Sequence, residues 1–211
     1  MRPEELGQSY DEIAEDWLAP DLQSDGIPQF ERAIRFAGSH GYALDIGCGC
    51  SGRFFDLLVG HGFQVEGVDV SARMVELSRP RRPNFPVQLA DICQWDFPRK
   101  YEFISAWDDI WHVPLAKQES LLQKICAGLT PGGVFIFTTG GIDGSVGETN
   151  TPMGPPVHYG IPGIPRTIEL LTMFGCVCRH LEYDQLPEQR HVCVIAQKLC
   201  FSMPCPESRS C

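Results

Sequence analysis

Short apolar runs alternate with amphipathic segments along most of the chain. Apolar residues at helical spacing predict helices over residues 4–18, 27–38, 53–60, 114–129 and 165–174. Ser71 is a typical cap for a further helix that extends to about residue 78. Short apolar runs predict buried strands over residues 42–46 and 134–137, and further strands are expected over 63–68, 87–90 and 101–106. Two final strands, over 176–183 and 191–197, are separated by a short polar turn, which favours an antiparallel hairpin.

This order of elements predicts a doubly wound α/β fold. Strands that alternate with helices pair in parallel, with helices on both faces of the sheet. We expect one domain over residues 1–199, beginning with a helical lid over 1–38, and a disordered tail over 200–211. Residues 139–163 are rich in Gly and Pro and lack periodicity. Their length exceeds that of an ordinary connection, so we expect an inserted functional loop there.

A glycine-rich turn follows the first predicted strand. Residues 44–52 read LDIGCGCSG, and glycines there let the backbone turn tightly and approach a ligand closely. The spacing satisfies the G-x-G-x-x-G pattern of dinucleotide sites, and Asp69 follows the second strand, where a ribose-binding acid is expected. Two cofactors are open at this point, a nicotinamide dinucleotide and S-adenosylmethionine (SAM).

Charge distinguishes these two cofactors. A dinucleotide would place an anionic pyrophosphate on the glycine turn, beside the carboxylate of Asp45. SAM has no phosphate and carries a sulfonium and an ammonium group. Asp45, Asp69 and Asp91 follow or end neighbouring predicted strands, at the edge where open α/β sheets bind ligands. Three acids at one edge favour SAM.

Four segments resemble motifs of the class I SAM-dependent methyltransferases, of the small-molecule, type 11-like kind. They occur in the family's order, at residues 43–49, 65–74, 90–92 and 129–133. The resemblance implies a mostly parallel seven-stranded sheet of order 3-2-1-4-5-7-6, with the last strand antiparallel. There is one departure: two residues, rather than one, separate Gly49 from the next glycine. The turn is therefore expected to be one residue wider than in the family.

The resemblance also implies a set of cofactor contacts. The residues expected to contact SAM are Tyr10, Trp17, Asp45, Gly47, Cys48, Gly49, Asp69, Val70, Met74, Asp91, Ile92 and Trp107. Within this set, Asp69 would accept both ribose hydroxyls, a charge-assisted interaction. Val70 and Ile92 would sandwich the adenine, and Asp91 would accept from its exocyclic amine. Asp45 would orient backbone amides or the amino group, directly or through water. For Met74 and the two lid aromatics, core packing is the equally weighted alternative.

Residues on the acceptor side are predicted less directly. The residues expected to face the methyl acceptor are Asp108, Trp111, His112, His158 and Tyr159. His112 is the first candidate for a general base because it titrates near neutrality, and packing at a helix start is its alternative. Asp108 and Asp109 would bind a cationic acceptor or cap the next helix. The inserted segment 139–163 would fold over the acceptor and exclude water.

Composition and charge restrict the kinds of molecule that the protein is expected to bind. The formal charge is −10, from 17 Lys+Arg and 27 Asp+Glu, which disfavours nucleic acid and anionic membranes. Residues 1–16 lack an apolar core region, and no run approaches the length of a membrane span, so we expect a cytoplasmic protein. Ten cysteines include no C-x-x-C pair, and no metal is expected.

These observations predict a SAM-dependent methyltransferase that acts on a small organic acceptor by in-line displacement, as a monomer or homodimer. The literal glycine pattern leaves an NAD-dependent oxidoreductase of Rossmann type as an alternative. A SAM-binding protein without turnover is a third reading of the same residues.

Overall fold

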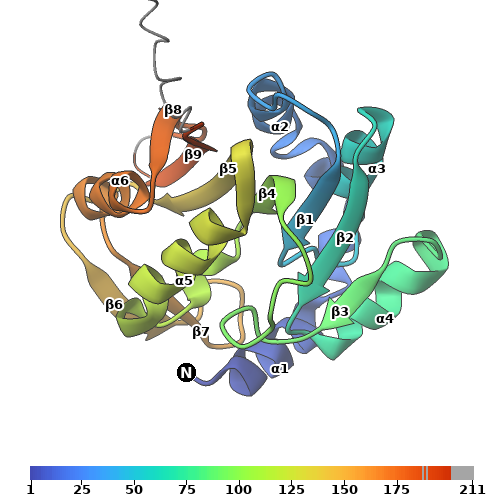
Figure 1. Ribbon diagram of the computed structural model, residues 1–211. Helices are drawn as coiled ribbons and strands as arrows, with labels where there is room; N and C mark the ends of the chain where they lie inside the picture. The colour runs from blue at the N-terminus through green and yellow to red at the C-terminus, as the bar shows by residue number, and fades with distance from the viewer. Residues whose placement is uncertain (187, 189, 201–211) are drawn as a thin grey trace, which may run out of the picture.

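The computed structural model describes residues 1–186, 188 and 190–200, and its centre is a seven-stranded sheet (Figure 1). The strands are β1 (Tyr42–Ile46), β2 (Gln64–Asp69), β3 (Val87–Leu89), β4 (Tyr101–Ala106), β5 (Leu129–Gly140), β8 (Cys176–Tyr183) and β9 (His191–Lys198). They are arranged in the order β3-β2-β1-β4-β5-β9-β8, and β9 is antiparallel to both of its neighbours. Numbered among themselves, these seven strands have the predicted order 3-2-1-4-5-7-6, which confirms the fold class.

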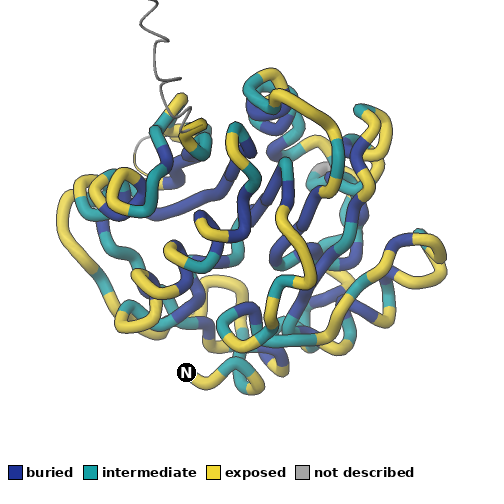
Figure 2. Tube along the Cα trace, viewed as in Figure 1, coloured by how far each residue is buried: buried dark blue, intermediate teal, exposed yellow. Residues whose placement is uncertain are grey.

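Helices cover both faces of the sheet. Helices α5 (Leu115–Gly128) and α6 (Ile164–Met173) pack on one face, and α2 (Ile27–Ile34) and α3 (Arg53–Gly60) pack on the other. Successive strand residues point to opposite faces, so Leu44 joins the first core and Ala43 the second. Figure 2 shows the resulting concentration of buried positions along the strands. Helix α4 (Ala72–Arg81) follows β2, and the Ser71 hydroxyl caps it by accepting from Met74 N at 3.0 Å.

Two segments from distant parts of the sequence lie at the edge where the parallel strands end. One is helix α1 (Pro3–Ile13), and the other is the hairpin of β6 (Val146–Asn150) and β7 (Val157–Ile161) (Figure 1). Ser9 Oγ donates to the carbonyl of Pro156 at 2.7 Å and joins the two. Gly7 lies so close to the end of β2 that a Cβ there would come within 2.5 Å of Val70 O.

Several element boundaries differ from the prediction. The helix expected over 4–18 ends at Ile13, and two short 3₁₀ helices follow, η1 (Asp16–Leu18) and η2 (Pro20–Ser24). The helix expected over 27–38 ends at Ile34. The segment 139–163 contains the β6–β7 hairpin rather than an irregular loop. Most of β6 is exposed, so its sequence carries no alternating apolar signal.

The predicted tail lies outside the described residues, apart from Cys200. Among the residues that the structure does describe, no helix has the length and apolar character needed to cross a bilayer. The assignment of residues 1–199 to one domain, with the first 38 residues as a lid, stays a prediction.

Candidate active site

Two adjoining cavities, which together we call the cleft, lie at the end of the parallel strands. The empty space is about 530 Å³ in the first and about 610 Å³ in the second, and both values include space that is open to solvent. Both cavities are lined by Leu6, Gly47, Asp69, Val70 and Asp109. The cleft is therefore one elongated site that passes over the glycine turn and under α1.

The glycine turn has the backbone that the sequence predicted. Gly47 and Gly49 have φ of 64° and 58°, in the left-handed region that favours glycine. Gly47 N donates to Val68 O at 2.8 Å, which fixes the turn to β2. Nothing lies within 4 Å of a Cβ placed on Gly49, so a ligand can approach the backbone there. Cys48 lines the second cavity, while its sulfur packs against Gly67 on the far side of the turn.

Asp69 occupies the middle of the cleft. Its Oδ2 accepts from Gly49 N and its Oδ1 from Ser71 N, each at 2.8 Å. Burial raises the pKa of Asp69 to about 6, although these backbone hydrogen bonds act to lower it. Each carboxylate oxygen has a second lone pair. The side chain can thus hold the glycine turn and still accept hydrogen bonds from a ligand.

The first cavity contains the residues expected around adenine. Val70, Asp91 and Ile92 all line it, together with Ala90 and Pro114. The Asp91 carboxylate accepts from Cys93 N at 2.9 Å and from the Gln94 side chain at 3.0 Å. These hydrogen bonds fix Asp91 at the end of β3, and the mainly apolar walls suit a flat heterocycle.

Asp45 lies elsewhere than expected. Its side chain lines neither cavity and accepts from Ser105 Oγ at 2.7 Å, beneath the glycine turn. Residue 45 shares the sheet face of residue 43, so it points toward α3 rather than into the cleft. Burial raises the pKa of Asp45 to about 7. A direct contact between Asp45 and a cationic ligand is therefore not supported by the structure.

Asp109 supplies the carboxylate expected beside the turn. A Cβ built on Gly47 would overlap its side chain, so Asp109 lies directly on the turn and lines both cavities. Burial, and then the charges of Asp69 and Asp45, raise the pKa of Asp109 to about 8. The sequence left Asp109 between two roles and did not place it at the turn, because no local pattern indicates which way its side chain points.

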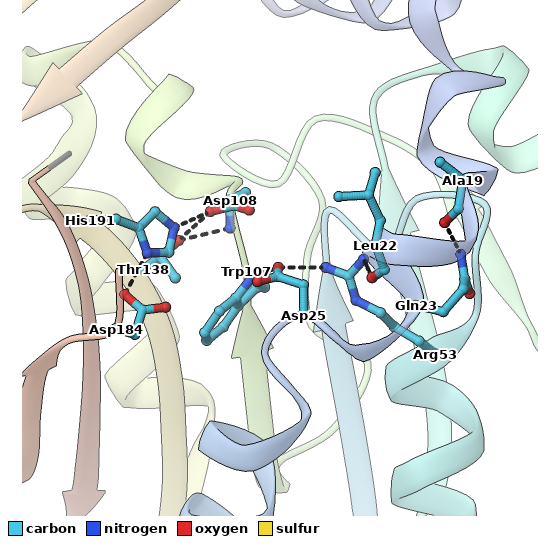
Figure 3. A network of polar contacts seen from close by, with 10 residues as sticks. All are labelled: Ala19, Leu22, Gln23, Asp25, Arg53, Trp107, Asp108, Thr138, Asp184 and His191. Carbon is cyan, nitrogen blue, oxygen red and sulfur yellow. Dashed lines mark hydrogen bonds and ion pairs between the residues drawn. The ribbon is translucent and has the colours of Figure 1, made fainter. Parts of the chain in front are cut away.

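Aromatic residues line the second cavity. Tyr10, Trp17, Trp107 and Met74 all line it, and their contact with a cofactor stays a prediction. Trp107 Nε1 donates to Asp25 Oδ2 at 2.9 Å (Figure 3). Tyr10 and Trp17 come from α1 and η1, so the N-terminal segment forms one wall of the cleft.

Arg53 is a site residue that the sequence did not single out. It is the first residue of α3, lines the second cavity and has a side chain that is 8% exposed. Its Nη1 donates to Leu22 O at 2.7 Å and its Nη2 contacts Asp25 Oδ2 at 3.3 Å (Figure 3). Among the described residues, its Nε is the one buried side-chain nitrogen or oxygen atom without a hydrogen-bond partner. A buried N–H of this kind is costly unless a ligand accepts from it.

His112 connects three parts of the site. Its Nδ1 lies 2.7 Å from the carbonyl of His158, and its Nε2 lies 2.7 Å from Tyr10 Oη and 3.0 Å from Trp111 Nε1. A carbonyl only accepts and an indole N–H only donates. The ring is therefore the neutral tautomer with hydrogen on Nδ1, and Tyr10 donates to Nε2. Burial lowers the pKa of His112 to about 4.

The hydrogen bonds and the lowered pKa of His112 affect its predicted role as a general base. The single lone pair of His112 already accepts from two donors, and the low pKa makes the ring a weak base. General-base catalysis by His112 stays a prediction, but the contacts favour a role in joining α1 to the hairpin. The hydrogen bond from Tyr10, on α1, and the hydrogen bond to the carbonyl of His158, on β7, both end on this ring.

The other residues predicted to face the acceptor are brought together only in part. Asp108 lines the second cavity. Trp111 and Tyr159 lie with ring centroids 5.9 Å apart, and Tyr159 also lies 5.0 Å from His112. His158 reaches the site through its backbone carbonyl, because its imidazole instead contacts Thr149 on β6, with Nδ1 3.1 Å from Oγ1. No metal-ligand group of three His, Cys, Asp or Glu side chains is found in the described ranges.

Comparison with known proteins identifies a matching family and several similar proteins. A family model described as a methyltransferase domain matches residues 21–195. The ubiquinone biosynthesis O-methyltransferase of Coxiella burnetii is 27% identical over 150 residues, which are 64% of this chain and 61% of that protein. The carboxy-S-adenosyl-L-methionine synthase of Photobacterium profundum is 31% identical over 154 residues, which are 64% of this chain and 62% of that protein. The chain thus matches about three fifths of the length of these curated relatives.

Solved structures share the fold. The CcbJ methyltransferase from Streptomyces caelestis has a TM-score of 0.70 and 13% identity, over 95% of this chain and 100% of that one. The 1,6-didemethyltoxoflavin-N1-methyltransferase of Burkholderia thailandensis has a TM-score of 0.67 and 17% identity, over 95% of this chain and 92% of that one. At these identities the likeness concerns the arrangement of helices and strands.

Proposed function

The chain belongs to the family of methyltransferase domains, and on this premise we propose that it methylates a small organic acceptor with SAM as the methyl donor. The observation that carries the proposal is the chemistry of the cleft. Asp69 and Asp109 line it, with pKa values that burial raises to about 6 and about 8. Carboxylates of this kind are stabilised by a positively charged ligand.

The residues present fit SAM part by part. Asp69 would accept the ribose hydroxyls with the lone pairs that Gly49 and Ser71 leave free. Val70 and Ile92 would hold the adenine in the first cavity. The orphaned Nε of Arg53 would donate to the carboxylate of the methionine part. Together these groups recognise a nucleoside joined to an amino acid.

Asp109 would face the positive end of the cofactor. Its carboxylate lies on Gly47, where a dinucleotide would place its pyrophosphate. Two like charges at this position would repel each other, which argues against the NAD-dependent alternative. An ammonium or sulfonium there would instead lower the pKa of Asp109 and favour its ionised form.

When bound, SAM supplies an electrophilic methyl group, and the chain has to align an acceptor with it. Positioning of this kind contributes a large part of the rate in reactions between two bound molecules. The aromatic walls from Tyr10 and Trp107 would exclude water. The bonds of His112 to Tyr10 and to the hairpin would hold the lid closed over both reactants.

Binding and turnover are tested separately. Calorimetry should show that SAM and S-adenosylhomocysteine bind, and that NADH does not. Binding of NADH without SAM would overturn the proposal. Labelled SAM is then incubated with a metabolite extract, and the labelled product is identified by mass spectrometry. Label that never leaves SAM, with cofactor binding intact, would favour a SAM-binding protein without turnover.

A further inference from the structure

His191, which is not among the expected cofactor contacts, lies between two carboxylates at the edge of the cleft. His191 is the first residue of β9, and because β9 is antiparallel it pairs with Gly140 at the end of β5. Its Nδ1 lies 2.6 Å from Asp184 Oδ1, and its Nε2 lies 2.7 Å from Asp108 Oδ1 (Figure 3). The side chains of His191, Asp108 and Asp184 are 8%, 20% and 3% exposed.

The imidazole of His191 is positively charged. Ionised carboxylates only accept hydrogen bonds, so both ring nitrogens carry hydrogen. Burial acts to lower the pKa of His191, but the bonds and charges of Asp108 and Asp184 outweigh it and raise the pKa to about 10. The ring thus stays protonated throughout the neutral range.

Asp108 is fixed from two sides and free on a third. Its Oδ1 also accepts from Thr138 Oγ1 at 3.2 Å, while its own backbone N–H donates to Thr138 Oγ1 at 2.8 Å. The backbone of Asp108 has φ of 55°, a left-handed conformation that residues other than glycine rarely adopt. Within the part of the chain that the structure describes, its Oδ2 accepts no hydrogen bond.

The free oxygen belongs to a carboxylate that lines the second cavity. Burial raises the pKa of Tyr159, and the charge of Asp108 adds to this effect. Burial and then the charge of Asp109 raise the pKa of Tyr10, with a smaller contribution from Asp108. Trp111 packs edge-on against His191, with 5.3 Å between ring centroids. Asp108 thus lines the cavity beside Tyr10 of α1, and the partner of its carboxylate, His191, packs against Trp111, one of the residues predicted to face the acceptor.

We propose that Asp108 binds the methyl acceptor through a positively charged group on that molecule, and that His191 and Asp184 are positioning residues that aim Asp108. This inference rests on the proposed function. The second cavity is lined by three acids, Asp69, Asp108 and Asp109, and by one cation, Arg53. If Asp69, Asp109 and Arg53 serve the cofactor, Asp108 remains, and it shares the single imidazolium of His191 with Asp184. One positive group between two acids leaves these three side chains with a formal negative charge. A small amine satisfies it, and a carboxylate or phosphate is repelled.

The test uses three probes of the same size and different charge. Benzylamine, benzyl alcohol and benzoate are titrated into protein that is saturated with S-adenosylhomocysteine, with calorimetry and the NMR signals of the His191 ring as readouts. Benzylamine should bind about tenfold more tightly than benzoate, the ratio expected for one partly exposed charged hydrogen bond. Benzyl alcohol should lie between them. Equal affinity for the three probes, or no binding of benzylamine, would overturn the proposal.

Variants separate the roles. Asp108→Asn should remove the preference for benzylamine and leave the affinity for S-adenosylhomocysteine within about twofold. A loss of cofactor affinity of tenfold or more in this variant would assign Asp108 to SAM and refute the inference. His191→Gln and Asp184→Asn should each weaken the preference in folded protein, whereas unchanged selectivity would mean that they only stabilise the fold. Exposed Asp96 provides the control Asp96→Asn. Failure of the wild type to bind SAM would instead refute the proposed function.

Discussion

Replacement of Asp69 by Asn is the most direct test of how the cleft recognises its ligand. Each oxygen of Asp69 accepts one backbone N–H at 2.8 Å, and each retains one lone pair for a ribose hydroxyl. The amide oxygen of Asn can still accept, but its NH₂ group cannot. One hydrogen bond to the ribose and the negative charge are therefore lost.

The magnitude follows from the kind of hydrogen bond. A hydrogen bond to a charged group contributes about 1.5–3 kcal/mol, so the dissociation constant should rise by about 10- to 150-fold. Isothermal titration with S-adenosylhomocysteine measures this change, because the product binds without turnover. The variant also loses one of the hydrogen bonds to Gly49 N or Ser71 N, so a second comparison is needed to separate the ribose from the turn.

That comparison uses adenosine and 2′,3′-dideoxyadenosine, which differ in the two ribose hydroxyls. The wild type should bind adenosine more tightly, by at least the factor that Asp69→Asn loses, and the variant, which keeps one accepting oxygen, should show a smaller difference between the two nucleosides. Asp96→Asn, an exposed acid away from the cleft, should behave as the wild type. Equal affinity of the wild type for the two nucleosides, or a variant that distinguishes them as strongly as the wild type, would show that the ribose lies elsewhere.

Three further predictions follow from the same site. Burial, with the neighbouring acids, raises the pKa of Asp109 to about 8, and a bound cation favours its ionised form. The affinity for SAM should therefore rise from pH 6 to pH 9, and binding near pH 7 should release protons. Calorimetry in two buffers of different ionisation enthalpy detects this release. Tighter binding at pH 6 would contradict the prediction. Arg53→Met should weaken S-adenosylhomocysteine by about tenfold but leave adenosine unchanged, and an equal loss for both ligands would exclude a contact with the carboxylate. Tyr10→Phe removes the 2.7 Å bond to His112 and keeps the ring. Amide hydrogen exchange in α1 should then accelerate by about fivefold, for a bond of about 1 kcal/mol, and unchanged exchange would show that this bond does not hold the lid.

The sequence determined those features that depend on local pattern. Apolar runs bounded by turn residues placed the strands, and the alternation with helices determined that they pair in parallel. The glycine turn and Asp69 were predictable because both lie within a few residues of a strand end. At such a position, the chain direction alone brings a side chain or a backbone amide to the carboxyl edge of the sheet.

Only the tertiary structure decided which acids face the ligand. Asp45 and Asp109 both follow or end a predicted strand, yet the face of β1 turns Asp45 toward Ser105 and leaves the turn to Asp109. A single sequence does not record the torsion angles that set this choice.

Contacts between segments that are distant in the chain could not be predicted from the sequence either. His191 and Asp108 are 83 residues apart and meet because β9 runs antiparallel beside β5. Arg53 is held by Leu22 of η2, a short 3₁₀ helix whose sequence carries no periodic signal. Local patterns determine elements and their order, whereas the partners of a charged side chain depend on which elements the packed core brings together.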